Sequence, residues 1–161
     1  MKILGVDPGT NRIGYGILET EGGLSFIDCG VIETTSRTQA DKLFEITTRF
    51  RELLVSTKPD AAGIETLFFS KNQKTGLAVA EARGVLLLSL RDAGILTYEY
   101  KPHEVKLSVC GYGLADKIAV ATMVAKILRI EVPKQYDDAT DALAIAITAA
   151  NYLRFAKRIA A

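Results

Sequence analysis

Hydrophobic and polar positions along this 161-residue chain follow two periods, one typical of strands and one typical of helices. Short apolar runs bounded by glycine, proline or aspartate predict five strands, at residues 2–6, 13–18, 26–34, 61–66 and 96–100. Longer segments with apolar residues every three or four positions predict helices at residues 39–55, 75–92, 103–109, 116–129 and 137–157. The first three strands are close enough in sequence to form an antiparallel meander, and helices then alternate with strands. This order predicts the α/β class, with a five-stranded mixed sheet flanked by helices.

The composition is that of a globular protein with a substantial core, because 48% of the residues are hydrophobic. We therefore expect a single domain that spans residues 1–161. The formal net charge of +1 argues against a broadly basic nucleic-acid coat but allows a local basic patch. Apolar stretches such as 85–88 are too short to span a bilayer, and no signal-like stretch follows Met1. Cys29 and Cys110 form no metal-binding pattern, so we expect two reduced, buried thiols in a cytoplasmic protein with no membrane partner.

Acidic residues stand at the edges of three apolar elements that are far apart in the sequence. Asp7 ends the first strand, Glu65 ends the fourth, and Asp138 and Asp141 share one face at the start of the last helix. Several carboxylates brought together repel one another unless protons or cations intervene. Their oxygens are the ligands that Mg²⁺ prefers, and two such ions can activate a water molecule and stabilise the departing oxygen in phosphoryl chemistry. The four acids are therefore candidate catalytic and metal-binding residues.

Each of these acids also has a purely structural interpretation. Asp7 precedes Pro8-Gly9 and is typical of a turn, while Glu65 is typical of an exposed strand end. Acids in the first turn of a helix cap it and favour its dipole, which is the role we expect for Asp137. A cap needs only one acid, so Asp138 and Asp141 favour the metal-binding interpretation.

Five sequence blocks, in order, resemble the RuvC-type Holliday-junction resolvases. They are Gly-Val-Asp-Pro-Gly-Thr at 5–10, Ile-Glu-Thr-Leu-Phe-Phe-Ser-Lys-Asn at 64–72, Glu-Ala-Arg-Gly-Val at 81–85, Val-Lys at 105–106, and Asp-Ala-Thr-Asp-Ala-Leu-Ala-Ile-Ala-Ile-Thr at 138–148. The resemblance runs from residue 2 to about residue 151. It places the family's catalytic acids on Asp7, Glu65, Asp138 and Asp141, although some members carry histidine where this chain has Asp138.

The resemblance also implies a fold and an activity. The fold is ribonuclease-H-like, and the activity is that of a homodimeric endonuclease that resolves four-way DNA junctions in homologous recombination and DNA repair. Paired symmetric nicks would leave 5′-phosphate and 3′-hydroxyl ends. The implied cofactor is Mg²⁺, two ions per active site, with Mn²⁺ as a substitute. The implied partners are four-way junction DNA and a RuvA–RuvB branch-migration complex.

Six further residues are candidates for DNA contact. Phe68 matches an aromatic residue that family members use against bases, and we expect it to be exposed while Phe69 is buried. Lys106 and Lys117 match basic positions that the family places near the scissile phosphate. The remaining candidates, for backbone phosphates, are Lys71, Lys74 and Arg83.

Paired nicking requires two active sites related by a two-fold axis, and the helix at 75–92, with Leu77, Val85 and Leu88, is a candidate interface. Three other functions stay open. The same fold and metals could cut RNA or an RNA–DNA hybrid. The turn at 7–10 is similar to phosphate-binding turns of actin-like and sugar-kinase ATPases, although this chain has no second copy of it and no Gly-x-x-x-x-Gly-Lys loop. The chain could also be a non-enzymatic junction binder whose acids only cap and turn.

Overall fold

The computed structural model describes residues 1–67, 73–131 and 137–159 of the chain. Five strands and five helices lie within this part of the chain: β1 (Lys2–Asp7), β2 (Arg12–Glu19), β3 (Ser25–Glu33), α1 (Gln39–Thr57), β4 (Ala61–Glu65), α2 (Gln73–Asp92), β5 (Leu96–Tyr100), α3 (Pro102–Cys110), α4 (Lys117–Leu128) and α5 (Asp137–Ile159). Every element that the sequence pattern predicts is present, with each end within two residues of the expected position.

The strands form one mixed sheet in the order β3-β2-β1-β4-β5. β1 pairs antiparallel with β2, and β2 pairs antiparallel with β3, as expected for a meander. β1 pairs parallel with β4, and β4 pairs parallel with β5. Since parallel strands end at the same edge, the carboxyl ends of β1, β4 and β5 lie together, where an open α/β sheet commonly carries its site.

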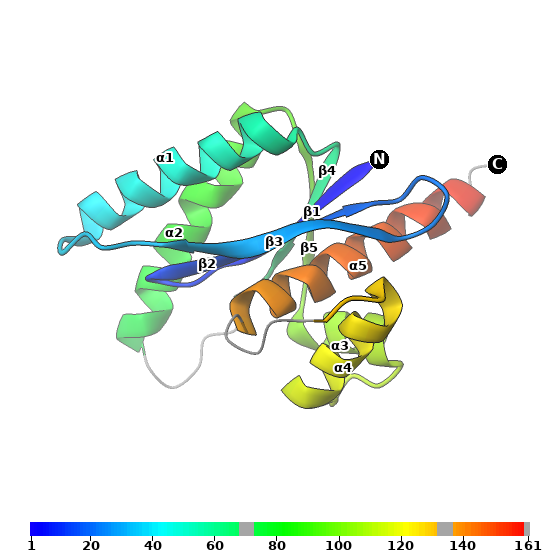
Figure 1. Ribbon diagram of the computed structural model, residues 1–161. Coiled ribbons are helices and arrows are strands. Elements are labelled where there is room, and N and C mark those ends of the chain that lie inside the picture. The colour runs from blue at the N-terminus through cyan, green and yellow to red at the C-terminus, as the bar shows by residue number, and fades with distance from the viewer. Residues whose placement is uncertain (68–72, 132–136, 160–161) are drawn as a thin grey trace.

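The sheet separates two layers of helices (Figure 1). α1 and α2 cover one face, and the side chains of Leu4, Phe50 and Leu86 belong to the core on that side. α5 crosses the other face, with α3 and α4 beside it, and Ile3 and Leu143 belong to this second core. The alternation of Ile3 and Leu4 between the two cores shows why a short strand buried on both faces reads as a continuous apolar run.

α5 lies directly on the sheet because glycines leave room for its backbone. A Cβ atom on Gly5 would fall 2.0 Å from the carbonyl oxygen of Ala142, and one on Gly16 would fall 2.8 Å from the backbone nitrogen of Leu143. Contacts this short exclude any other side chain at these positions without a shift of the helix. The result is a helix whose first two turns are held against the ends of β1 and β2.

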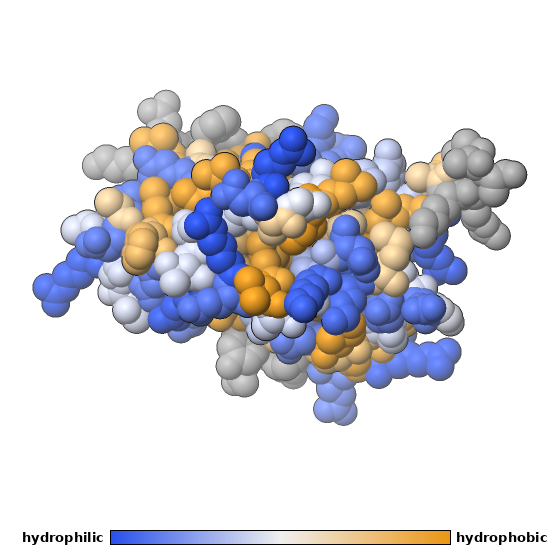
Figure 2. Space-filling model, turned by 90° about the horizontal axis from the view of Figure 1, so that it is seen from above, coloured by the Kyte–Doolittle hydropathy of each residue, from blue (hydrophilic) through white to orange (hydrophobic). Residues whose placement is uncertain are grey.

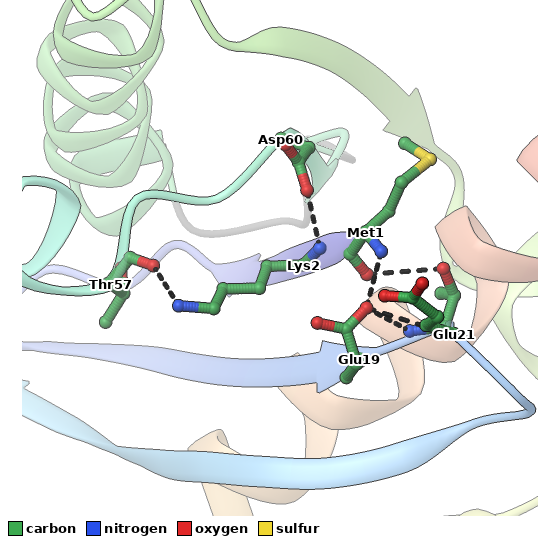
Figure 3. A network of polar contacts seen from close by, with 7 residues as sticks. Met1, Lys2, Glu19, Glu21, Thr57 and Asp60 are labelled. Carbon is green, nitrogen blue, oxygen red and sulfur yellow. Dashed lines mark hydrogen bonds and ion pairs between the residues drawn. The ribbon is translucent and has the colours of Figure 1, made fainter.

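A polar network anchors the amino end of β1 (Figure 3), at the other end of the strand from Asp7. The amino group of Met1 pairs with Glu19 at 2.5 Å, which ties β1 to β2. The backbone nitrogen of Lys2 donates to Asp60 at 2.7 Å, and its ammonium group donates to the carbonyl oxygen of Thr57 at 3.1 Å. These bonds join β1 to the α1–β4 connection and so fix the register of the strand that ends in Asp7.

The surface mixes apolar and charged patches, as the view from the α1 side shows (Figure 2). α1 exposes the apolar side chains of Phe44 and Val55 there. None of the helices in the described part of the chain is both long enough and apolar enough to span a membrane. Cys29 and Cys110 are only half-buried, which corrects the expectation of two fully buried thiols.

Candidate active site

Asp7 and Glu65 are brought together by the parallel pairing of β1 with β4. Val6 lies opposite Ile64 in this register, so the next residue of each strand is an acid at the same edge of the sheet. The backbone beyond Glu65 is fixed as well, because the amide of Thr66 donates to the carbonyl oxygen of Tyr100 at 2.8 Å. A rigid sheet edge of this kind holds side chains in place for chemistry.

Asp138 and Asp141 reach the same edge from the first turns of α5. The helix approaches so closely that a Cβ atom on Gly14 would fall 2.0 Å from the carbonyl oxygen of Asp138. The three-residue spacing puts both aspartates on one helix face. Two segments more than 130 residues apart in sequence therefore contribute to one site.

The four acids line a single cavity of about 350 Å³, as the site prediction requires. We call Asp7, Glu65, Asp138 and Asp141 the acidic cluster. Lys106 and Lys117, which are candidates for DNA contact, line the same cavity. The remainder of the lining is Pro102, Val105, Val120 and Ala144.

Burial and mutual repulsion change the acidity of the cluster. Burial, followed by the charges of the other three acids, raises the pKa of Asp7 from 3.8 to about 8. Burial is also the main cause of the raised pKa of Glu65 and of Asp141, in which a neighbouring acid adds to the effect. Because burial and the neighbouring acids favour its protonated form near neutral pH, Asp7 is poised to exchange its proton for a cation.

Two cations of the chain already pair with the cluster. Lys117 Nζ lies 3.3 Å from Asp141 Oδ2, and this pairing is the main cause of the raised pKa of the Lys117 ammonium. Arg12 Nε lies 3.2 Å from Asp138 Oδ2. Within the described residues, no group of three or more histidine, cysteine, aspartate or glutamate side chains is arranged as it stands to hold a metal ion. The cluster therefore shares one cavity, but its carboxylates do not yet converge on one point.

Arg12 is not among the site residues that the sequence pattern predicted. The period of the strand contains a signal for it, because Arg12, Gly14 and Gly16 alternate on the β2 face that α5 covers. This face places Arg12 beside the start of α5, where its guanidinium group reaches Asp138.

Arg83, a candidate for phosphate binding, is instead engaged with the protein. Its Nε donates to the carbonyl oxygen of Glu65 at 3.0 Å, and its guanidinium group pairs with Glu99. The side chain is only 16% exposed. The structure thus places Arg83 as a support for the end of β4, and its contact with DNA stays a prediction.

The other candidates for DNA contact fall in parts of the chain that are less fully described. Phe68, Phe69 and Lys71 lie outside the described residues. Lys74 lies in the first turn of α2, where only the backbone is described. Their contacts with DNA stay predictions.

Residues 3–149 match the sequence profile of the family described as "Crossover junction endodeoxyribonuclease RuvC". The chain belongs to the RuvC family. Its curated relatives include RuvC from Roseiflexus sp. (strain RS-1), 47% identical over 91% of this chain and 88% of that protein. RuvC from Petrotoga mobilis is 44% identical over 96% of each chain. This RuvC chain is accordingly an endodeoxyribonuclease.

Solved structures support the same assignment. The structure titled "T. thermophilus RuvC in complex with Holliday junction substrate" is 31% identical, with a TM-score of 0.89 over 97% of this chain and 96% of that one. A yeast mitochondrial Holliday junction resolvase, Ydc2, shares the fold at a TM-score of 0.63 and 14% identity, over 98% of this chain and 85% of that one. The expected ribonuclease-H-like fold is confirmed.

Proposed function

We propose that this chain resolves four-way DNA junctions by paired symmetric nicks in homologous recombination and DNA repair. It would act as a single domain with two Mg²⁺ ions per active site, or Mn²⁺ in their place, and leave 5′-phosphate and 3′-hydroxyl ends. The observation that carries the proposal is the cavity in which all four acids meet two lysines. A RuvA–RuvB branch-migration partner, expected from the family resemblance, is part of the same proposal.

The donor set fits the metal. RuvC nucleases are metal-dependent, and the acidic cluster offers only carboxylate oxygens, the ligand type of hard divalent cations. Burial, followed by repulsion from the other acids, raises the pKa of Asp7, and a bound cation would offset both effects by favouring the ionised carboxylate. Two bound Mg²⁺ ions would lower the pKa of the attacking water and stabilise negative charge on the departing oxygen.

The protein's own groups orient the substrate around this centre. Lys117 is 74% exposed at its side chain and begins α4, so its ammonium group can reach a phosphate while it remains close to Asp141. Lys106 lines the cavity from α3 and adds a second positive charge. Basic groups aimed at a phosphodiester stabilise the charge that develops on its oxygens.

A homodimer through α2 would supply the second active site. Leu77, Glu81, Gly84 and Leu88 are all exposed and follow the three- and four-residue spacing of one helix face. Apart from its chain neighbours and the backbone of its own helix, no atom of the described residues lies within 4 Å of a Cβ atom placed on Gly84. A glycine in mid-helix costs about 1 kcal/mol relative to alanine, and no contact within the described chain explains it here. Close approach of a second α2 helix does explain it, as small residues allow backbones to pack closely.

The proposal is tested by incubating a labelled synthetic four-way junction and an RNA–DNA hybrid duplex with the protein in Mg²⁺, in Ca²⁺ and in a chelator. We expect symmetric cutting of the junction in Mg²⁺, association without cutting in Ca²⁺, and little cutting of the hybrid. Equal cutting in the chelator would refute the metal mechanism. Preferential cutting of the hybrid would favour the RNA-directed alternative.

Asp7→Asn should retain junction binding and lose cutting. Asp137→Asn is the matched control, because Asp137 is exposed, stands next to Asp138 and does not line the cavity. If Asp7→Asn cuts as well as Asp137→Asn in Mg²⁺, the site assignment is wrong and the non-enzymatic alternative gains support. An ATP-binding assay on the same protein tests the remaining alternative.

A further inference from the structure

Arg12 occupies a position that the dipole of α5 disfavours. It begins β2 and reaches the amino end of α5, where the helix dipole is positive and repels a cation. Its Nε nevertheless lies 3.2 Å from Asp138 Oδ2. The attraction that keeps it there is the carboxylate of Asp138, a member of the acidic cluster.

A second carboxylate competes for the same nitrogen atom. Arg12 and Glu33 are cross-strand partners in the β2–β3 register, and Arg12 Nε lies 3.4 Å from Glu33 Oε1. One N–H group cannot point along two lines, so both contacts are weakened. Arg12 is 45% exposed and Glu33 63% exposed at the side chain, so neither is locked by packing.

The backbone of Asp138, in contrast, is packed directly on β2. Its carbonyl oxygen lies over Gly14, two residues along the same face of β2, at a distance that leaves no room for a Cβ atom. The side chain of Asp138 lines the cavity and at the same time pairs with Arg12, so rotation about its side-chain bonds can turn its carboxylate from Arg12 toward the other acids. The pairing with Arg12 accounts for carboxylates that share one cavity without converging on one point.

We propose that Arg12 is a positioning residue that holds Asp138 in the metal-free protein and competes with the divalent cation for that carboxylate. When the cation binds, Arg12 transfers to Glu33, so that its charge stays paired. The inference rests on the proposed metal site. It makes the metal affinity of the site adjustable through two residues that do not line the cavity.

The proposal predicts that two substitutions change the affinity for the metal ion in opposite directions. Arg12→Gln frees Asp138 and should tighten metal binding about two- to five-fold, the range set by a partly exposed ion pair. Glu33→Gln removes the alternative partner, strengthens the hold of Arg12 on Asp138, and should weaken metal binding by a similar factor. Arg12→Lys keeps the charge and should bind metal within about two-fold of the unchanged protein.

Mn²⁺ binding, measured by titration calorimetry in the absence of DNA, tests this directly. Arg51→Gln is the matched control: Arg51 forms an ion pair with Asp92 on α1 and α2, is 52% exposed, and does not line the cavity. The double variant Arg12→Gln with Glu33→Gln separates the transfer from a general charge effect. Glu33→Gln should change the affinity only when Arg12 is present, because independent charges would act additively.

The outcomes discriminate between the two proposals. If the unchanged protein binds Mn²⁺ and Asp7→Asn does not, but Arg12→Gln behaves as Arg51→Gln does, the role of Arg12 is overturned and the metal site stands. Additive effects of Arg12→Gln and Glu33→Gln would also overturn the transfer. If the unchanged protein does not bind Mn²⁺ at all, the proposed metal site is overturned, and the inference about Arg12 with it.

Discussion

Gly14 lies against Asp138, so that a single hydrogen in place of a side chain on β2 determines how the candidate site is assembled. A Cβ atom on Gly14 would meet the carbonyl oxygen of Asp138 at 2.0 Å and its carbonyl carbon at 2.5 Å. Neither is the end of a flexible side chain, so the strain can be relieved only by moving the first turn of α5. That turn carries Asp138 toward the cavity.

Gly14→Ala should therefore destabilise the protein by about 1–3 kcal/mol, the usual cost of forced overpacking. Cutting of a four-way junction should fall by more than about tenfold under conditions in which the variant is still folded, because a shift near 1 Å in a catalytic group is costly. Urea denaturation and a cutting assay measure the two effects. Gly113→Ala is the control, since a Cβ atom there meets its nearest atom, the carbonyl oxygen of His103, at an ordinary 3.4 Å.

Arg83 holds the backbone of Glu65 in place through a hydrogen bond. Replacing Arg83 should distinguish this structural role from a role in DNA binding. Arg83→Met keeps the apolar stem but loses the bond to the carbonyl oxygen of Glu65 and the pairing with Glu99. We expect a loss of about 1–3 kcal/mol in the free energy of unfolding, because a partly buried carbonyl group loses a charged donor. Cutting should fall, while junction affinity in Ca²⁺ should stay within about two-fold, the effect of losing at most one weak surface charge contact.

The phosphate-binding role that the sequence suggested for Arg83 predicts the reverse pattern: lower junction affinity and unchanged stability. Glu99→Gln is the companion variant. It removes the ion pair and leaves the bond to Glu65, so it should reduce stability less than Arg83→Met does. If Arg83→Met weakens binding and leaves the unfolding curve unchanged, the supporting role is wrong.

Arg12 and Arg83 show what the sequence alone cannot predict. The period of apolar positions was sufficient to predict every strand and helix, and the placement of acids at strand ends predicted that Asp7 and Glu65 would meet. Alternation along a strand depends only on the backbone, so it can be read from the sequence. Alternation also places Arg12 on the same face of β2 as Gly14 and Gly16, but the partners of Arg12 and Arg83 depend on which helix lies over which strand, and a long flexible side chain does not indicate its partner in advance.

The role of three glycines could not be predicted from the sequence either. Gly5, Gly14 and Gly16 interrupt two apolar strands and could each mark a bulge or a bend. Their role is to admit the backbone of α5, which comes more than 100 residues later. Only the docked helix distinguishes these possibilities. The ion pairs that hold Asp138 and Asp141 follow from the same docking and were equally out of reach.

The exposed stripe on α2 gives a prediction about assembly. Leu88→Glu should convert a dimer into monomers, with the dissociation constant raised at least about tenfold, because a charge would be buried against an apolar helix face. Sedimentation at several protein concentrations measures this. Leu107→Glu is the matched control: Leu107 is 55% exposed on α3, close to the 57% of Leu88. Equal effects of the two variants would indicate that α2 is not the interface.

Asp7 provides a prediction about pH that needs no substrate. Its pKa is about 8 in the folded protein and near 3.8 in the unfolded chain, chiefly because of burial. Below pH 4 both states hold the proton, and Asp7 has no effect on stability. Between pH 4 and pH 8 the unfolded chain releases the proton first, so this residue lowers the stability of the metal-free protein as pH rises, and the penalty is constant above pH 8.

Asp7→Asn should therefore stabilise the metal-free protein by about 1–3 kcal/mol at pH 7, less than the full shift implies because the cluster titrates together. The gain should vanish near pH 4 and grow toward pH 8, as measured by urea denaturation in a chelator. Asp92→Asn, at an exposed acid paired with Arg51, should show no such gain. Added Mg²⁺ should stabilise the unchanged protein and not Asp7→Asn, which reverses their order. A gain that does not depend on pH would show that ionisation of the buried Asp7 carboxyl group is not its cause.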